Sequence, residues 1–166
     1  MGRLATEAGT PLTGGMADNP IALTPAGQGR KLQAFGEHVT ILVDGEQSNG
    51  VCTQWIEDTP PGVGPPPHLH LNEDEWFYVI SGSVSFFDGR TGQWTELGAG
   101  GSAFMPRGSA HTFKNTGRET SRMLVTTTPS GFERFFGRCA EVFAQPGPPD
   151  MARIMAISAE HGIQFV

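Results

Sequence analysis

The feature that most constrains the fold is a series of short β-branched and apolar runs, which turn-forming residues separate about every eight to twelve residues. The runs occupy residues 37–44, 51–58, 75–80, 83–87, 94–97, 102–105, 111–114 and 122–128. Each is long enough for a strand and too short for a typical helix. The 23 glycines and 13 prolines of the chain agree with many turns. The pattern predicts an all-β fold, either a sandwich or a barrel.

The periodicity changes after Pro129, where apolar side chains follow the spacing of one helical face. A first helix is predicted to carry Phe132, Phe135, Phe136, Cys139 and Phe143 on that face. The PGPPD segment ends this helix, and Asp150 is placed to cap a second one. We expect Gly162 to end the second helix and the IQFV segment to add an edge strand.

Length and composition fit one domain with additional segments at its ends. The chain has 166 residues, of which 37% are hydrophobic and 17% charged, enough apolar surface to bury a core. We expect a flexible leader over residues 1–18, an extended arm over 19–36, a barrel over 37–128 and C-terminal helices over 129–166 that pack on it. Small barrels leave strand edges exposed and the arm can cross to a second copy, which predicts a homodimer.

Charge and hydropathy argue against several classes of partner. The formal net charge is −6 without a basic cluster, so no nucleic-acid partner is predicted. No window approaches about 18 consecutive apolar residues, so no membrane partner is predicted. The first residues, MGRLATEAGTPLTGG, lack the apolar stretch of a signal peptide, so a cytoplasmic location is expected.

Three of the five histidines fall in two short stretches that predict a metal site. His68 and His70 are two residues apart, so on a strand they point to the same face. A bend over the LNED segment can return the carboxylate of Glu75, which opens the next strand, to the same pocket. His111 opens a later strand, directly after an MPRG turn. These four side chains are the predicted ligands.

Imidazole and carboxylate ligands together suit one divalent transition metal ion, which can be Fe, Ni, Mn, Cu, Co or Zn. Four protein ligands leave two positions of an octahedral ion for water, dioxygen or a bidentate substrate. An open position is typical of a catalytic site, whereas structural zinc sites are closed.

The two stretches resemble the two sequence motifs of the cupin superfamily. The first, G-x5-H-x-H-x4-E-x6-G, is matched by Gly62, His68, His70, Glu75 and Gly82. The second, G-x5-P-x-G-x2-H-x3-N, is matched by Gly100, Pro106, Gly108, His111 and Asn115. The resemblance implies a double-stranded β-helix, or jelly-roll barrel, with a short C-terminal helical segment. Gly82 and Gly108 are expected to have positive φ in turns, and Asn115 to hydrogen-bond a neighbouring loop.

The chain is most similar in layout to single-domain cupins that resemble quercetin dioxygenases. The points of resemblance are PPPHLHLNEDEWFYVISG, MPRGSAHTFKN, GFERFF and AEHGIQF. The resemblance implies a metal-dependent dioxygenase that acts on a small enolisable or aromatic substrate, such as a flavonol. Glu75 would then be a ligand and the catalytic base that removes a substrate hydroxyl proton.

Two alternatives stay open because one fold hosts many functions. The metal can act as a Lewis acid in isomerisation, decarboxylation or hydrolysis. The barrel can also bind a small molecule without turning it over.

Strand alternation also suggests residues that surround the metal. Phe77 shares a face with Glu75, and Phe113 shares one with His111, so these two rings either line an apolar pocket or belong to the barrel core. Glu73 and Asp74 directly precede Glu75, and we expect both to face solvent.

Overall fold

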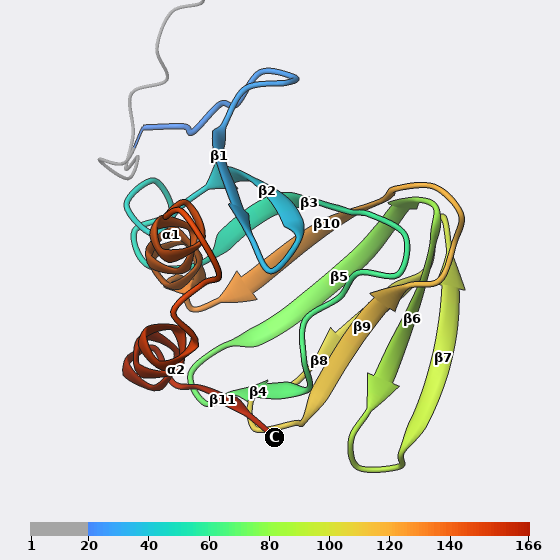
Figure 1. The fold of residues 1–166 in the computed structure, drawn as a ribbon. Helices are drawn as coiled ribbons and strands as arrows, with labels where there is room; N and C mark the ends of the chain where they lie inside the picture. The colour runs from blue at the N-terminus through green and yellow to red at the C-terminus, as the bar shows by residue number, and fades with distance from the viewer. Residues whose placement is uncertain (1–19) are drawn as a thin grey trace, which may run out of the picture.

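The protein forms two antiparallel β-sheets with two helices at its C-terminal end (Figure 1). The computed structural model describes residues 20–166, so the predicted leader over residues 1–18 lies outside the part of the chain described. The six-stranded sheet contains, in spatial order, β1 (Arg30–Ala34), β2 (Glu37–Val43), β3 (Thr53–Thr59), β10 (Ser121–Thr128), β5 (Asp74–Ser81) and β8 (Ser102–Met105). The five-stranded sheet contains β11 (Ile163–Phe165), β4 (His68–His70), β9 (His111–Asn115), β6 (Ser83–Asp88) and β7 (Gln93–Gly98). This arrangement confirms the predicted all-β class.

The strands lie close to the predicted runs, and one strand comes from the segment expected to be an extended arm. Strand β1 pairs with β2 through a two-residue connection, Phe35-Gly36. Both residues have positive φ, 55° and 84°, as a tight hairpin turn with the right-handed twist of its strands requires. The six-stranded sheet therefore begins before residue 37.

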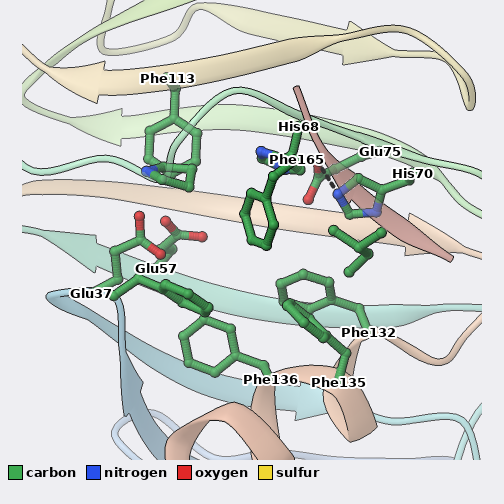
Figure 2. Close-up of a pocket in the computed structure, with 13 residues that line it drawn as sticks. Glu37, Glu57, His68, His70, Glu75, Phe113, Phe132, Phe135, Phe136 and Phe165 are labelled. Carbon is green, nitrogen blue, oxygen red and sulfur yellow. Dashed lines mark ion pairs between the residues drawn. The ribbon is translucent and has the colours of Figure 1, made fainter. Parts of the chain in front are cut away.

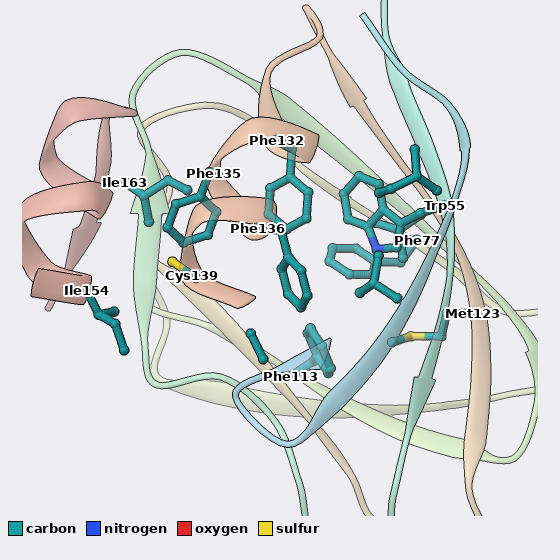
Figure 3. Close-up of a cluster of buried hydrophobic side chains, with 14 of the residues drawn as sticks. Trp55, Phe77, Phe113, Met123, Phe132, Phe135, Phe136, Cys139, Ile154 and Ile163 are labelled. Atoms are coloured by element: carbon teal, nitrogen blue, oxygen red, sulfur yellow. The ribbon is translucent and has the colours of Figure 1, made fainter. Parts of the chain in front are cut away.

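The two sheets share one core of alternating inward side chains (Figure 3). On β3 the buried residues are Thr53, Trp55, Glu57 and Thr59, so the odd-numbered side chains of this strand face inward. On β5 the same alternation buries Glu75, Phe77 and Val79. The apolar members of both strands enter the core, whereas the two glutamates reach a pocket beside it.

Helices α1 (Phe132–Phe143) and α2 (Met151–Glu160) follow the last long strand, as predicted. Asp150 caps α2 by accepting a hydrogen bond from the Arg153 backbone N–H at 3.0 Å. The buried face of α1 includes Phe135 and Phe136, which contact the ring of Phe35. Among the described residues, neither helix has the length and apolar character needed to cross a membrane.

The expected turn and loop roles are confirmed. Gly82 and Gly108 have φ of 85° and 78°. The side chain of Asn115 donates to the backbone carbonyls of Thr59 and Glu119, at 2.7 and 2.8 Å. Gly108 N–H also donates to the His70 carbonyl at 2.7 Å. This last bond ties the turn before His111 to the strand that carries His70.

Candidate metal centre and its pocket

The structure brings His68, His70, Glu75 and His111 together as a possible metal site. One potential ligand atom from each residue lies within 4.8 Å of the others, and all four side chains are buried. The three histidines come from β4 and β9 of the five-stranded sheet, whereas Glu75 comes from β5 of the six-stranded sheet. The site therefore lies between the two sheets.

Pairing between short strands sets the positions of the histidines. His68 lies opposite His111 in the β4–β9 pair, and His68 and His70 share a face because they are two residues apart. On its other edge β4 pairs with β11, with His70 opposite Ile163 and His68 opposite Phe165. The histidine strand is thus held on both edges.

The hydrogen bonds of the rings fit a metal in this position. Nδ1 of His68 lies 2.9 Å from the Pro66 carbonyl, and Nδ1 of His111 lies 2.9 Å from the Ser109 carbonyl. A carbonyl can only accept, so each Nδ1 carries a proton, and Nε2 is the nitrogen of each ring that can bind a metal once it is deprotonated. Second-shell bonds of this kind orient metal-binding histidines. The donor set is therefore compatible with one transition-metal ion.

For His68 and Glu75, burial and neighbouring charges favour the protonation states that metal ligands need. The pKa of His70 is instead raised, because its burial is outweighed by Glu75 and Glu73. Burial, followed by the adjacent His111 and His70, lowers the pKa of His68 to about 4, so this ring is neutral near pH 7. Burial alone would raise the pKa of Glu75, but His70 and the hydrogen bond with His111 outweigh burial and lower it. Nε2 of His111 and Nε2 of His70 lie 3.3 and 3.8 Å from Glu75 Oε2.

The expectation that Glu73 faces solvent is wrong. Its side chain is 7% exposed, and its Oε2 lies 3.6 Å from Nδ1 of His70. Neither atom has a hydrogen-bond partner in the described part of the chain, and 3.6 Å is longer than a hydrogen bond. The bend before β5 turns Glu73 inward, behind the His70 ring. Asp74 is half-buried and pairs with Arg107, whose NH2 group lies 2.8 Å from its Oδ2.

A largely aromatic pocket opens beside three of the four predicted ligands, His68, His70 and Glu75 (Figure 2). It contains about 470 Å³ of free space, part of it open to solvent. Its phenylalanines come from the β1–β2 turn, β9, α1 and β11, and they are Phe35, Phe113, Phe132, Phe135, Phe136 and Phe165. Phe113 lines this pocket, whereas Phe77 packs behind it in the core, with ring centroids 5.5 Å apart.

Two further carboxyl groups line the pocket, and the sequence reasoning missed them. Glu37 begins β2 and Glu57 lies on β3, and they are 4% and 3% exposed. Burial, followed by the charges of Glu57 and Glu75, raises the pKa of Glu37 well above its ordinary value. Burial also raises the pKa of Glu57, to about 7. The only available signal was strand alternation, which places Glu57 on the same face as Trp55.

The fold is a jelly-roll barrel, and comparison with known proteins shows that part of the chain is similar to cupins. Residues 55–127 match the cupin domain family, and this range contains all four predicted ligands. Among curated proteins, none matches this chain significantly. The jelly-roll fold with C-terminal helices, expected from the resemblance, is confirmed.

Solved structures with similar folds have diverse functions. A predicted oxalate decarboxylase from Thermotoga maritima is 26% identical, with a TM-score of 0.52, over 56% of this chain and 80% of that chain. The polyketide cyclase RemF from Streptomyces resistomycificus is 27% identical, with a TM-score of 0.53, over 61% of this chain and 70% of that chain. An RmlC-like cupin from Shewanella frigidimarina has a TM-score of 0.55 at 18% identity, over 64% of this chain and 89% of that chain, which shows the fold alone.

Proposed function

We propose that this protein is a metal-dependent cupin dioxygenase that acts on a small aromatic, enolisable substrate. The observation that carries the proposal is the set of four buried potential ligands beside a pocket lined by phenylalanines. A divalent transition metal held by His68, His70, Glu75 and His111 would supply a Lewis acid for an enolate oxygen and, if redox-active, a route for reaction with dioxygen.

The residues of the chain would bind and orient the substrate. The rings of Phe113, Phe132 and Phe136 form apolar walls, which favour a flat aromatic molecule and exclude water. The ionised carboxylate of Glu75 is the group placed to accept the proton of a substrate hydroxyl. These features support a flavonol-like substrate class.

Lewis-acid chemistry without dioxygen is the second candidate. The neighbours at 26% and 27% identity, a predicted oxalate decarboxylase and a polyketide cyclase, support this reading of the metal site. The pocket lining, all of which lies within residues 20–166, contains no lysine or arginine. A strongly anionic substrate, such as a sugar phosphate, is therefore disfavoured relative to an aromatic one.

The first experiment is elemental analysis of the purified protein. We expect about one transition-metal ion per chain in the wild type, and its loss in His68→Ala/His111→Ala, because each substitution removes one ligand. The control is His38→Ala/His161→Ala, which removes two histidines that are outside the site and should keep the metal.

Dioxygen uptake with a flavonol then distinguishes the two candidate reactions. Uptake that requires the metal supports the dioxygenase. Zinc as the bound metal, without dioxygen uptake, would favour the Lewis-acid reaction. If neither the purified nor the reconstituted wild type held metal, the metalloenzyme proposal would fail and a small-molecule-binding barrel would remain.

We also propose that the protein forms a homodimer through the outer face of the six-stranded sheet. Trp76, Tyr78 and Ile80 on β5 are 41%, 48% and 42% exposed, and Phe104 on β8 is 50% exposed. Trp76 and Phe104 are paired across the two strands, with ring centroids 4.7 Å apart. A contiguous exposed apolar patch of this kind marks an interaction surface. Strand β1 is already paired with β2 of its own chain.

A further inference from the structure

The carboxyl groups of Glu37 and Glu57 stand apart from the four predicted metal ligands. They come from neighbouring strands β2 and β3, where Val39 is opposite Glu57. Their side chains point into the same pocket, on the side away from His70 (Figure 2). The aromatic walls therefore connect two polar regions.

The two groups differ in how their own oxygens are satisfied. Glu57 accepts hydrogen bonds from Trp55 Nε1–H at 3.0 Å and from the Thr59 hydroxyl at 3.4 Å. Glu37 is 4% exposed, and its fully buried oxygen Oε1 has no hydrogen-bond partner within residues 20–166. Burying a polar atom without a hydrogen-bond partner is unfavourable. A ligand that forms a hydrogen bond with this oxygen would remove that cost.

The donors around the pair determine where the shared proton resides. Two buried carboxyl groups side by side cannot both be ionised readily. The hydrogen bonds from Trp55 and Thr59 stabilise the ionised form of Glu57, which leaves the proton on Glu37. Above about pH 7, where Glu57 is ionised, the pair thus offers one hydrogen-bond donor and one anionic acceptor.

We propose that Glu37 and Glu57 form a second polar subsite that binds a hydroxyl group of an aromatic ligand. A hydroxyl matches the pair because it donates to the carboxylate of Glu57 and accepts from the carboxylic acid of Glu37. This subsite rests on the proposed function and narrows its substrate class. The substrate would carry a free hydroxyl group at the end of the molecule that lies away from the metal ligands. Glu37 and Glu57 would thus determine which substrates bind, without taking part in the reaction at the metal.

Phenol and anisole test the subsite directly, because they share a ring and only phenol can donate a hydrogen bond. Binding of each is measured by titration calorimetry, with the metal present and after chelation. We expect the wild type to bind phenol about tenfold more tightly than anisole, as for a hydrogen bond to a charged group. The double variant Glu37→Gln/Glu57→Gln should bind the two molecules within about twofold of each other.

Asp58→Asn is the matched control, because Asp58 neighbours Glu57 on β3 but lies half-buried and pairs with Arg122. It should retain the preference for phenol. Glu37→Gln alone serves if the double variant does not fold, and it should also reduce the preference. Equal binding of phenol and anisole by the wild type, no binding of phenol, or a preference that persists in the double variant would overturn the subsite. A preference that survives chelation supports the subsite even if metal analysis and dioxygen uptake reject the proposed reaction.

Discussion

Buried glutamates in this molecule differ in whether hydrogen bonds compensate their burial. Glu133, in the first turn of α1, accepts from the Thr53 hydroxyl and from the backbone N–H groups of Gly45 and Gly131, the last two at 3.3 and 3.0 Å. These donors, together with the helix N-terminus, explain Glu133 as a structural residue. Oε1 of Glu37 has no such donor among the residues that the structure describes, which is why the pocket pair requires another explanation.

The pair makes stability depend on pH. The pKa of Glu57 rises from 4.5 to about 7 in the folded protein, mainly through burial. Between these values the folded state keeps a proton that the unfolded chain releases, so the free energy of unfolding falls as pH rises. Glu57→Gln removes this loss. We therefore expect the free energy of unfolding of Glu57→Gln, relative to that of the wild type, to increase by about 2 kcal/mol between about pH 5 and about pH 8.

Urea unfolding of the metal-free proteins measures this difference at each pH. The pKa of His68 is lowered to about 4, so its contribution has the opposite sign and strengthens as pH rises. That contribution is common to both proteins and largely cancels in the comparison. Glu75 and Asp58 also raise the pKa of Glu57 and are unchanged in the variant. The charge of Glu57 raises the pKa of Glu37, so the substitution also reduces the loss of stability that Glu37 causes as pH rises, which adds to the same trend. The control is Asp58→Asn, and a constant difference between Glu57→Gln and the wild type across the range would contradict the prediction.

The clustering of the four predicted ligands could be foreseen from the sequence, whereas the pocket carboxyl groups could not, for a physical reason. His68, His70 and Glu75 lie within eight residues, so local strand geometry and one bend relate them. Glu37 and Glu57 are twenty residues apart, and only the pairing of β2 with β3 brings them to one wall. Glu73 was misplaced because the direction of a tight bend depends on what packs behind it.

At the scale of elements, the short strand β11 supports the histidine strand β4. Leu71 N–H donates to the Gly162 carbonyl at 2.8 Å, and Val166 N–H donates to the Pro67 carbonyl at 3.0 Å. Antiparallel pairs alternate, so Gln164, which lies opposite Leu69 between these bonds, is also a hydrogen-bonded position. The side chain of Gln164 is exposed.

Gln164→Pro removes the backbone donor of an exposed position and fixes φ there, and Gln164→Ala is the matched control for loss of the side chain. We expect the proline variant to bind a transition metal about tenfold more weakly, because the support that orients the ligands is loosened. The alanine variant should resemble the wild type. Competition with a chromophoric chelator measures both affinities, and equal metal binding by the two variants would show that β11 does not support the site.

Most strands were predictable because their apolar alternation and turns are local in sequence. Strand β1 was not, because its sequence RKLQA has few β-branched or aromatic residues. Its turn, Phe35-Gly36, also lacks the Asn-Gly or Asp-Gly pair that marks a tight hairpin. The register of β1 is set by its pairing with β2, and α1 packs against it.

At the scale of the whole molecule, the proposed dimer gives a mass prediction. Sedimentation should give a species of about twice the 17.7 kDa of one chain. Trp76→Glu places a charge in the centre of the apolar patch and should give the monomer. Trp94→Glu changes a tryptophan that is 51% exposed on the other sheet, and it should leave the dimer intact. A monomeric wild type would contradict the proposal.

The residues that line the pocket come both from the part of the chain that matches the cupin domain family and from the segments that flank it. All four predicted ligands lie within residues 55–127, which match the cupin domain family. Phe35, Glu37 and the three phenylalanines of α1 lie outside that range. Most of the aromatic wall therefore comes from segments that flank the matched range, although Glu57 and Phe113 lie within it. Exchange of the flanking segments would change part of the pocket wall and leave the four predicted ligands in place, both for an engineer and for natural divergence.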